Sequence, residues 1–428
     1  MFFLLCGDPV APVFARATCV YALLLLMPCL TLAQPAALTL EDATRLAVAR
    51  APMLVARNAG VSAAEEEAER AGSLPDPMLV LGVDNLPITG RDALDFRADE
   101  MTMKRVGVRQ EIPGRAKREA RRNFAARKVD EAHALSDAAL LDVRRAAAQA
   151  WIELWTAQRE LAAIRALRSQ AATAADLAKA RAGAGAEPIS DALATEGVVL
   201  QLDNRIESVR ATRAAAQAGL ARWLGDSSVD AIAEATEFGS LPVSEGRLLA
   251  AIDRLGPLLP ATAQVAAAAA NIDVARAEKR SDWNVGASYG QRAGSRSDMF
   301  TIEVGFALPL FTRNRQDRGV AAREAEHAAA LAAREDLRRE ASARIRGDVA
   351  RWESLKRQVA RDENEVLPLA RDRSATALAA YGAGGDVQTW LNAQRDERDV
   401  QLLHAQHQGE LGRAWVALAY LLPIKAQP

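Results

Sequence analysis

The sequence has few cysteines and few aromatic side chains, and these shortages exclude several kinds of protein. Only three cysteines occur among 428 residues, and Cys6, Cys19 and Cys29 all precede a predicted signal-peptide cleavage site after Ala33. The mature chain is therefore expected to have no disulfide and no thiol ligand for a metal. Aromatic residues make up 5% of the sequence and alanine is abundant. This composition is typical of long, closely packed helices rather than of a broad globular core.

Excess charge of one sign is also missing. The formal net charge is −1, whereas a nucleic-acid-binding protein usually shows a basic excess. The four histidines are His133, His327, His404 and His407. Only the last two are spaced to share one face of a helix, and two histidines without a third ligand do not define a metal site. We therefore predict no metal site, no cofactor, no enzymatic activity and no nucleic-acid partner.

The N-terminal segment 1–33 is predicted to be a signal peptide. Its apolar run, ATCVYALLLLMPCLTLAQP, is too short for a good membrane-spanning helix and ends in small residues at Thr31-Leu32-Ala33. A lipoprotein signal would use Cys29, but Met27 and Pro28 fit such a signal poorly. No other apolar run approaches a membrane-spanning helix by this reading. The pattern indicates an exported protein of the bacterial envelope.

Four segments alternate with period two, which predicts strands with one apolar face. One of them reads TIEVGFALPLF, in which every second residue is large and apolar. Each of the four is about nine residues long, enough to cross a bilayer core when tilted. The predicted strands are about 77–86, 104–112, 282–291 and 300–310.

The remainder of the chain reads as long helices, and the plan occurs twice. Apolar residues recur at three- and four-residue steps over about 115–182, and a second long helix is predicted over about 316–380. Each half follows the order helix, strand, loop, strand, long helix, tip, helix. We therefore predict a first structural repeat over 34–225, a linker over 226–247 and a second repeat over 248–428.

The two faces of the predicted strands differ in a way that suits a membrane barrel. Four strands cannot close around a lumen, but three chains giving twelve strands can. A four-stranded sheet packed on a helix in a soluble protein remains the alternative explanation of the alternation. In the barrel interpretation the lipid-facing residues include Val106, Val108, Trp283, Tyr289, Val304 and Phe306, and the lumen-facing residues are Arg105, Arg109, Glu111 and Glu303.

The ordered set of motifs resembles the TolC-like outer-membrane factor family over essentially the whole mature chain. The carrying motifs are LTLEDATRLAVARAP near the mature N-terminus, ALPLFTRNR at the exit of the last strand, and Tyr381-x-x-Gly384 followed by a helix. The resemblance implies a mainly α-helical homotrimer. Its strands would form one twelve-stranded transmembrane β-barrel in the outer membrane, continued by a long periplasmic α-barrel.

The same resemblance implies partners and sites. The helical tip would dock a periplasmic adaptor protein, which joins an inner-membrane pump of the resistance-nodulation-division class. Family patterns place a gate at Asp191 and Tyr381, with Asp386 standing where an arginine reinforces the closed state in better-known members. The tip that contacts the adaptor would include Gly183, Gly185, Gly382, Gly384 and Gly385.

The stretch LPLFTRNRQDRG and the compact loops are most similar to the outer-membrane components of cobalt–zinc–cadmium and copper–silver efflux systems. The predicted function is thus the outer-membrane channel of a tripartite efflux pump, a passive export duct whose cargo is expected to be heavy-metal cations. The alternative is a soluble periplasmic coiled-coil scaffold or adaptor. Adaptors carry one helical hairpin flanked by β-rich domains, and this sequence lacks that arrangement.

Overall fold

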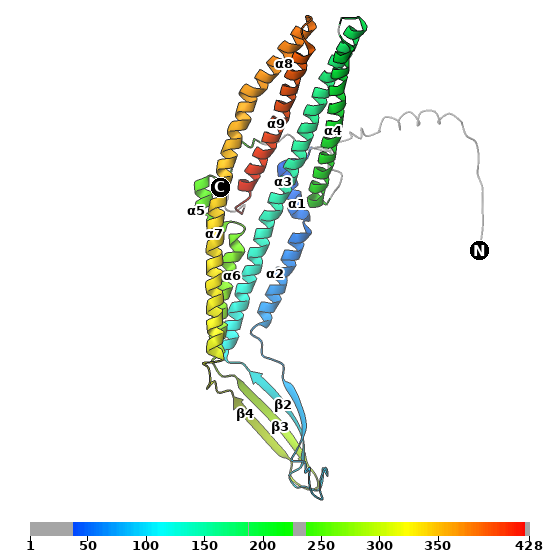
Figure 1. The fold of residues 1–428 in the computed structure, drawn as a ribbon. Helices are drawn as coiled ribbons and strands as arrows, with labels where there is room; N and C mark the ends of the chain where they lie inside the picture. The colour runs from blue at the N-terminus through cyan, green and yellow to red at the C-terminus, as the bar shows by residue number, and fades with distance from the viewer. Residues whose placement is uncertain (1–36, 187, 226–236, 424–428) are drawn as a thin grey trace, which may run out of the picture.

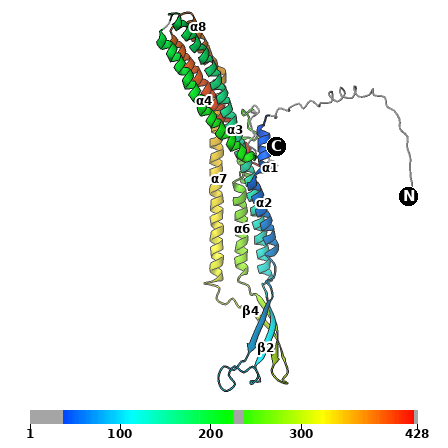
Figure 2. The ribbon, with the colours of Figure 1, turned by 90° about the vertical axis from the view of Figure 1, so that its right-hand side faces the viewer.

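The computed structural model describes residues 37–186, 188–225 and 237–423. The predicted signal peptide, 1–33, and the first part of the predicted linker lie outside the described residues. The chain is elongated, with a small sheet at one end, two helical hairpin tips at the other and a helical body between them (Figure 1). Figure 2 shows that the tip half of the helices leans away from the axis of the lower half.

The first half of the chain runs from the body to the sheet and then along the full length of the molecule. Its longest helix, α3, has 69 residues and therefore extends roughly 100 Å. A shorter helix, α4, returns from the tip and packs along α3. The elements of this half are α1 (Leu40–Arg50), α2 (Pro52–Arg70), β1 (Met78–Asp84), β2 (Met103–Ile112), α3 (Arg115–Gly183) and α4 (Ile189–Leu224).

The second half repeats this order with an interruption in its long helix. Its elements are α5 (Glu245–Ala250), the 3₁₀ turn η1 (Ile252–Arg254), α6 (Leu258–Ala277), β3 (Trp283–Arg292), β4 (Met299–Phe306), α7 (Gln316–Arg361), the π-helical turn η2 (Asp362–Val366), α8 (Leu367–Gly382) and α9 (Val387–Ala419).

The long helix predicted over 316–380 corresponds to a helical run over 316–382 that contains the π-helical turn η2. Pro368 follows the turn, and a proline has no N–H for the carbonyl four residues earlier and clashes with that carbonyl in a regular α-helix. The backbone instead makes a wider turn, in which the N–H of Leu367 bonds to the carbonyl of Asp362. The sequence analysis overlooked this proline.

The four strands form one antiparallel sheet in the order β1-β2-β3-β4. The last strand ends at Phe306, so the predicted extent of 300–310 is too long. Beyond it the N–H of Ala307 still bonds to the carbonyl of Asp282, at 3.3 Å. The chain then turns locally between Leu308 and Leu310, and Pro309 has no N–H to offer a neighbouring strand.

Helix α6 corrects a further expectation. The sequence analysis found no apolar run comparable with a membrane-spanning helix after the signal peptide. By length and composition alone, α6 is such a helix within the described residues. Only 28% of its most apolar 18-residue stretch is buried in the single chain. The run was missed because alanine, which dominates it, is only weakly apolar.

The main core lies in the middle of the helical body and joins the two repeats. Trp151 of α3 is fully buried and stacks on Trp155, whose ring meets Phe238 edge-on. Indole N–H groups then tie the segment before α5 to the second repeat. Trp352 donates to the carbonyl of Phe238 at 2.9 Å, and Trp415 donates to the carbonyl of Ser240 at 2.7 Å.

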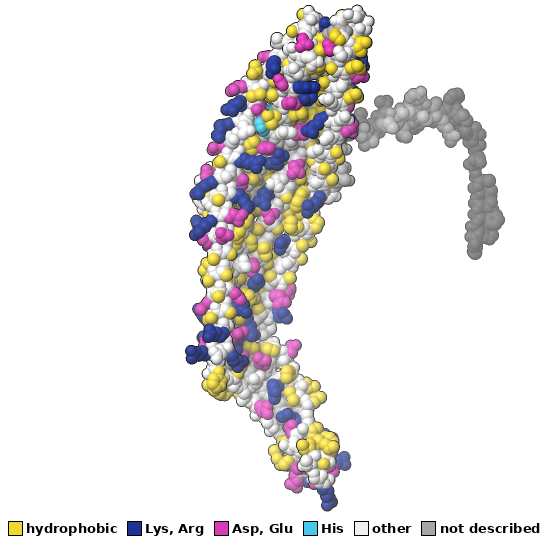
Figure 3. Space-filling model, in the orientation of Figure 1, with side chains coloured by type: hydrophobic (Ala, Val, Ile, Leu, Met, Phe, Trp, Pro, Cys, Tyr) yellow, Lys and Arg dark blue, Asp and Glu magenta, His cyan; other side chains and the backbone are white. Residues whose placement is uncertain are grey.

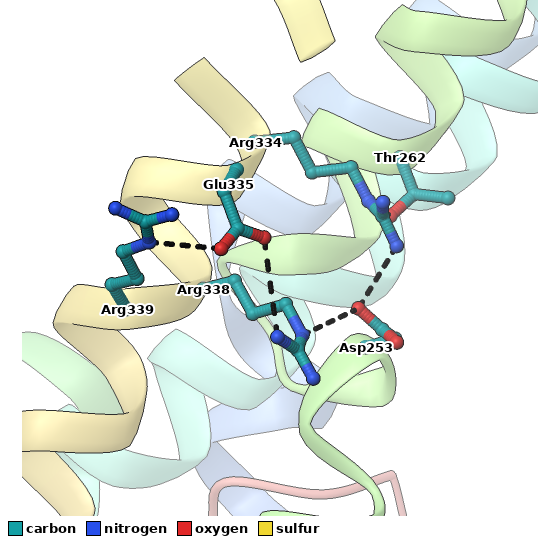
Figure 4. Close-up of polar contacts among 6 residues, drawn as sticks. All are labelled: Asp253, Thr262, Arg334, Glu335, Arg338 and Arg339. Carbon is teal, nitrogen blue, oxygen red and sulfur yellow. Dashed lines mark hydrogen bonds and ion pairs between the residues drawn. The ribbon is translucent and has the colours of Figure 1, made fainter. Parts of the chain in front are cut away.

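On the outside of the body, a polar network connects α7 with η1 and α6 (Figure 4). Arg334 donates to Asp253 at 2.9 Å and to Thr262 at 3.1 Å, and Arg338 lies 3.9 Å from the same aspartate. These side chains are partly exposed, so each pair contributes modestly. Together they fix the side of α7 that faces the start of α6.

We predict that the two indole hydrogen bonds contribute unequally to the free energy of unfolding. Trp352→Phe should lower the free energy of unfolding by about 1–3 kcal/mol, because the buried carbonyl of Phe238 loses its donor. Trp415→Phe should cost less than about 1 kcal/mol, because water can reach the exposed carbonyl of Ser240. Denaturant unfolding of the purified protein followed by circular dichroism measures both. Equal losses would contradict the assigned difference in burial.

Candidate functional site

Strand pairing puts most of the large apolar side chains of the four strands on one face of the sheet, while Met78, Val80, Met103 and Met299 lie on the other. Val106 pairs with Tyr289 and Val108 with Leu79, while Trp283 pairs with Phe306. All of these side chains are exposed in the single chain, as is every residue of β4. The face contains the six residues predicted to meet lipid, Val106, Val108, Trp283, Tyr289, Val304 and Phe306, together with Leu79, Leu81, Val285, Phe300 and Ile302.

The opposite face carries charged side chains separated by glycines. Arg109, Gly286 and Glu303 form one row across three strands, and the guanidinium of Arg109 reaches over the glycine to lie 3.5 Å from the carboxylate of Glu303. Arg105 pairs with Asp84 at 3.2 Å. Glu111 lies on the same face, opposite Asn284. The four residues predicted to line a lumen therefore share this face.

One glycine on this face is required by close approach of the strands. A Cβ atom at position 107 would lie 2.6 Å from the Cβ of Ser288 and 2.7 Å from the carbonyl of Ala287. No side chain fits there, so the floor between Arg105 and Arg109 stays open. The sequence alone does not reveal this close approach, because it depends on how β2 pairs with β3.

The junction between the sheet and the helices is organised by Asp282. Its carboxylate accepts from the backbone N–H of Gly114 at 3.0 Å and from Lys117 at 2.5 Å. Burial raises the pKa of Asp282, but the bonds from Lys117 and Gly114 outweigh it and hold the pKa below its usual value. A second pair, Lys279 with Asp317 at 2.5 Å, lies nearby along the chain and lowers the pKa of Asp317.

Glycines shape both hairpin tips. Gly185 and Gly384 have positive φ angles, which L side chains rarely adopt. A Cβ at Gly385 would lie 2.8 Å from the carbonyl of Ala380. Gly183 and Gly382 are the last residues of α3 and α8. All five predicted tip glycines therefore stand at or next to the two turns.

The residues predicted to form a gate are not brought together within the chain. The ring of Tyr381 is fully buried and stacks on Trp390 at 5.8 Å. The guanidinium of Arg181 covers it at 4.7 Å and donates to the Tyr381 carbonyl at 2.6 Å. Asp191 lies in the first turn of α4, where its carboxylate accepts from Ser190. Asp386 accepts from backbone N–H groups at the start of α9, as an N-cap.

The contact of Arg181 with Tyr381 therefore joins the first hairpin, α3–α4, to the second, α8–α9. Sequence reasoning missed this arginine because the contact spans 200 residues. Beside it, a groove of about 910 Å³ runs between the hairpins. Exposed Leu177 and Leu378 line it, and so do the mostly buried Gln394 and Glu397.

A polar cluster surrounds η2, where α9 passes the interrupted helix. Asp362 is mostly buried, and its carboxylate lies 2.7 Å from Nδ1 of His407 and 3.7 Å from Nδ1 of His404. Nε2 of His404 lies 3.7 Å from Glu363. Burial lowers the pKa of His404, with a further lowering by Arg159, and this outweighs the raising effect of the two carboxylates. Among the described residues no group of three or more His, Cys, Asp or Glu side chains is placed to hold a metal ion.

A family model and several solved structures match this chain. A family model described as outer membrane efflux protein matches residues 43–226 and 251–422. A comparison with curated protein sequences gave no match.

Several solved structures have a similar fold at low sequence identity. A membrane protein from Pseudomonas aeruginosa has a TM-score of 0.76 and 18% identity, with 90% of this chain and 92% of that chain covered. The outer membrane protein VceC from Vibrio cholerae has a TM-score of 0.73 and 19% identity, with 89% and 94% covered. The open state of the MtrE outer membrane channel from Neisseria gonorrhoeae has a TM-score of 0.71 and 14% identity, with 90% and 88% covered.

We predict that burial of His404 makes the helical body sensitive to acid. A histidine whose pKa is lower in the folded than in the unfolded state favours unfolding as the pH falls from above its unfolded pKa toward the folded one. His404→Gln should therefore reduce the loss of stability between about pH 7 and pH 5. Urea titrations at several pH values measure this.

The matched control is His133→Gln on α3, whose imidazole is exposed. It should leave the pH dependence unchanged. An acid loss in His404→Gln as large as in the wild type would show that the buried imidazole is not its source.

Proposed function

The chain belongs to the outer membrane efflux protein family, and from that premise we propose that it is the outer-membrane channel of a tripartite efflux pump. In this proposal it is a passive duct that receives cargo from an inner-membrane pump through a periplasmic adaptor. The observation that carries the proposal is the sheet, which has one mainly apolar, exposed face and one face with charged side chains and glycines. An apolar belt and a polar lumen are what a β-barrel membrane channel needs.

The proposed assembly is a homotrimer. A sheet in hydrocarbon must close, because unpaired backbone groups at a strand edge find no partner there. β1 and β4 are the edge strands of the described sheet, and three copies placed edge to edge give a closed barrel of twelve strands. Helix α6 is apolar and only partly covered within one chain. This supports the same assembly, because helices of a neighbouring copy would cover it.

The alternative, a soluble periplasmic scaffold or adaptor, is disfavoured by the same sheet. Val304 is 58% exposed, Phe306 55% and Ile302 67%. Such a contiguous apolar face is rare on a soluble surface and marks an interaction with lipid or another protein. No described helix covers it, whereas a soluble sheet would pack this face against one.

We predict that lipid contact by this face is needed for assembly. Val304→Asp with Phe306→Asp should be destabilising, with the larger cost at Val304 and the smaller at Phe306, which ends the strand near the interface. Trimers should then be depleted from outer-membrane fractions. The matched control is Thr301→Asp with Gly305→Asp on the opposite face of the same strand. Normal trimer yield from the first pair would refute the lipid-facing assignment.

The proposed gate lies at the tip, where the two hairpins of each chain meet. Tyr381 keeps the role that the family pattern suggests, and within the chain Arg181 contacts it. Asp191 would take part only by reaching another copy. The groove between the hairpins, with its exposed leucines and buried Glu397, is the proposed contact for the adaptor.

We predict that Arg181→Gln loosens the tip. The change removes a cation over an aromatic ring, and the free-energy loss should be about 1–2 kcal/mol per chain. Single-channel conductance in planar bilayers should rise while trimer yield stays normal. The control is Lys179→Gln, which breaks an ion pair to Glu196 within the first hairpin only. Wild-type conductance in Arg181→Gln would exclude this contact from the gate.

The proposed cargo is heavy-metal cations, handed over by the pump rather than selected by the channel. The support is the resemblance of LPLFTRNRQDRG to metal-efflux channels, and the described residues hold no cluster fit for a metal. Deleting the gene should lower metal tolerance, and the wild-type chain should restore it. His404→Gln with His407→Gln should restore it equally at neutral pH. Loss of tolerance in this variant at normal protein levels would overturn the unselective duct.

A further inference from the structure

The junction between sheet and helices carries an unbalanced positive charge. The segments 113–118, 279–282 and 307–318 contain eight basic side chains and two carboxylates. Both carboxylates are engaged, Asp282 with Lys117 and Asp317 with Lys279. The remaining charge is mainly arginine, and five exposed guanidinium groups have no ion pair within the described chain: Arg115, Arg280, Arg313, Arg315 and Arg318.

Hydrogen bonds bring these three segments together at one level of the molecule. The carboxylate of Asp282 accepts from the N–H of Gly114, and its backbone carbonyl accepts from the N–H of Ala307. The arginines that neighbour these residues in sequence are therefore held around the ends of α3, α6 and α7 that adjoin the sheet. Figure 3 shows Lys and Arg side chains gathered there, just before the molecule narrows into the sheet.

Exposed apolar side chains lie between the strand and these arginines. Leu308 is 63% exposed, Leu310 72% and Phe311 83%, and a hydrophobic patch is visible beside the basic side chains in Figure 3. The chain thus passes from the apolar strand face, through leucine and phenylalanine, to arginine. A bilayer leaflet has the same order along its normal, from hydrocarbon through the interface to phosphate.

The far end of the sheet differs in charge. The loop between β1 and β2, 85–102, contains Asp92, Asp95, Asp99 and Glu100 against two arginines. A basic excess is therefore confined to the end that adjoins the helices. In the proposed orientation this is the periplasmic end of the barrel.

We propose that Arg115, Arg280, Arg313, Arg315 and Arg318 bind the phosphate groups of anionic phospholipids in the periplasmic leaflet of the outer membrane. Guanidinium groups suit phosphate because they donate two parallel hydrogen bonds. Leu310 and Phe311 enter the acyl region below the bound headgroups. The inference rests on the proposed function, since it requires a barrel that spans this membrane.

The experiment compares lipid enrichment around purified full-length trimers in vesicles. The vesicles contain phosphatidylethanolamine with a minority of phosphatidylglycerol, and native mass spectrometry counts the lipids that remain bound. The wild type should enrich phosphatidylglycerol about tenfold over its bulk fraction. Arg313→Gln with Arg315→Gln and Arg318→Gln should reduce the enrichment to about twofold or less.

The matched control removes the same charge farther from the sheet, from within α7, by Arg334→Gln, Arg338→Gln and Arg339→Gln (Figure 4). It should keep wild-type enrichment. Raising the salt from 0.1 to 1 M should release phosphatidylglycerol from the wild type but not phosphatidylethanolamine, because salt screens exposed charges. This salt response tests the proposal on the wild type even where the triple variant fails to assemble.

The outcomes separate the inference from the proposed function. A wild type that does not insert into vesicles as a trimer would overturn the channel itself. A wild type that inserts without enriching phosphatidylglycerol would overturn only the phosphate site. Equal loss of enrichment in both triple variants would also overturn it. Total positive charge, and not the position of the arginines at the junction, would then explain the enrichment.

Discussion

A strand edge in hydrocarbon leaves its backbone N–H and C=O groups without partners, and this constraint governs the whole arrangement. The described sheet has two such edges, on β1 and β4, together with an apolar face that suits no aqueous environment. In the proposed assembly, closure with further copies gives the strand edges partners and places the apolar face against lipid. The helices follow directly from the strands, so closing the sheet in the proposed trimer also arranges α3 and α7 around the same axis. The bond from the N–H of Gly114 to Asp282 lies where the chain leaves the sheet, so in this assembly it links the geometry of the barrel to the helical body.

Alternation along each strand predicts that the strand has an apolar face, but not that the faces of different strands coincide. A slip of one residue in a single pairing would put its apolar set on the charged side. The register decides the matter, since Val106 stands opposite Tyr289 and Trp283 opposite Phe306. The row of Arg109, Gly286 and Glu303 depends on the same register and was invisible to a reading of separate segments.

Other parts of the structure depend on contacts that no local pattern contains. The turn η2 follows from Pro368, a local signal that was overlooked, but its polar partners come from α9, more than 40 residues away. Burial of Tyr381 against Trp390 and Arg181 depends on how two hairpins lean together. The resemblance to a family singled out Tyr381 and the tip turns, and these stay predictions. It assigned Asp191 as the partner, whereas within the chain the contact is made by an arginine that no motif marked.

The lengths of the helices have a consequence for how such a protein can change in evolution. α3 has 69 residues, and the run 316–382 that forms α7, η2 and α8 is almost as long, while α4 and α9 have 36 and 33. Both long runs start at the sheet and end at a tip (Figure 1). The number of residues in these two helical runs therefore sets the distance from the sheet to the tip. Lengthening one repeat alone would put its turn out of level with the other, so the reach changes only by paired insertions. Insertions of seven or eleven residues keep the buried side of each helix in phase, which makes the span adjustable in discrete steps rather than continuously.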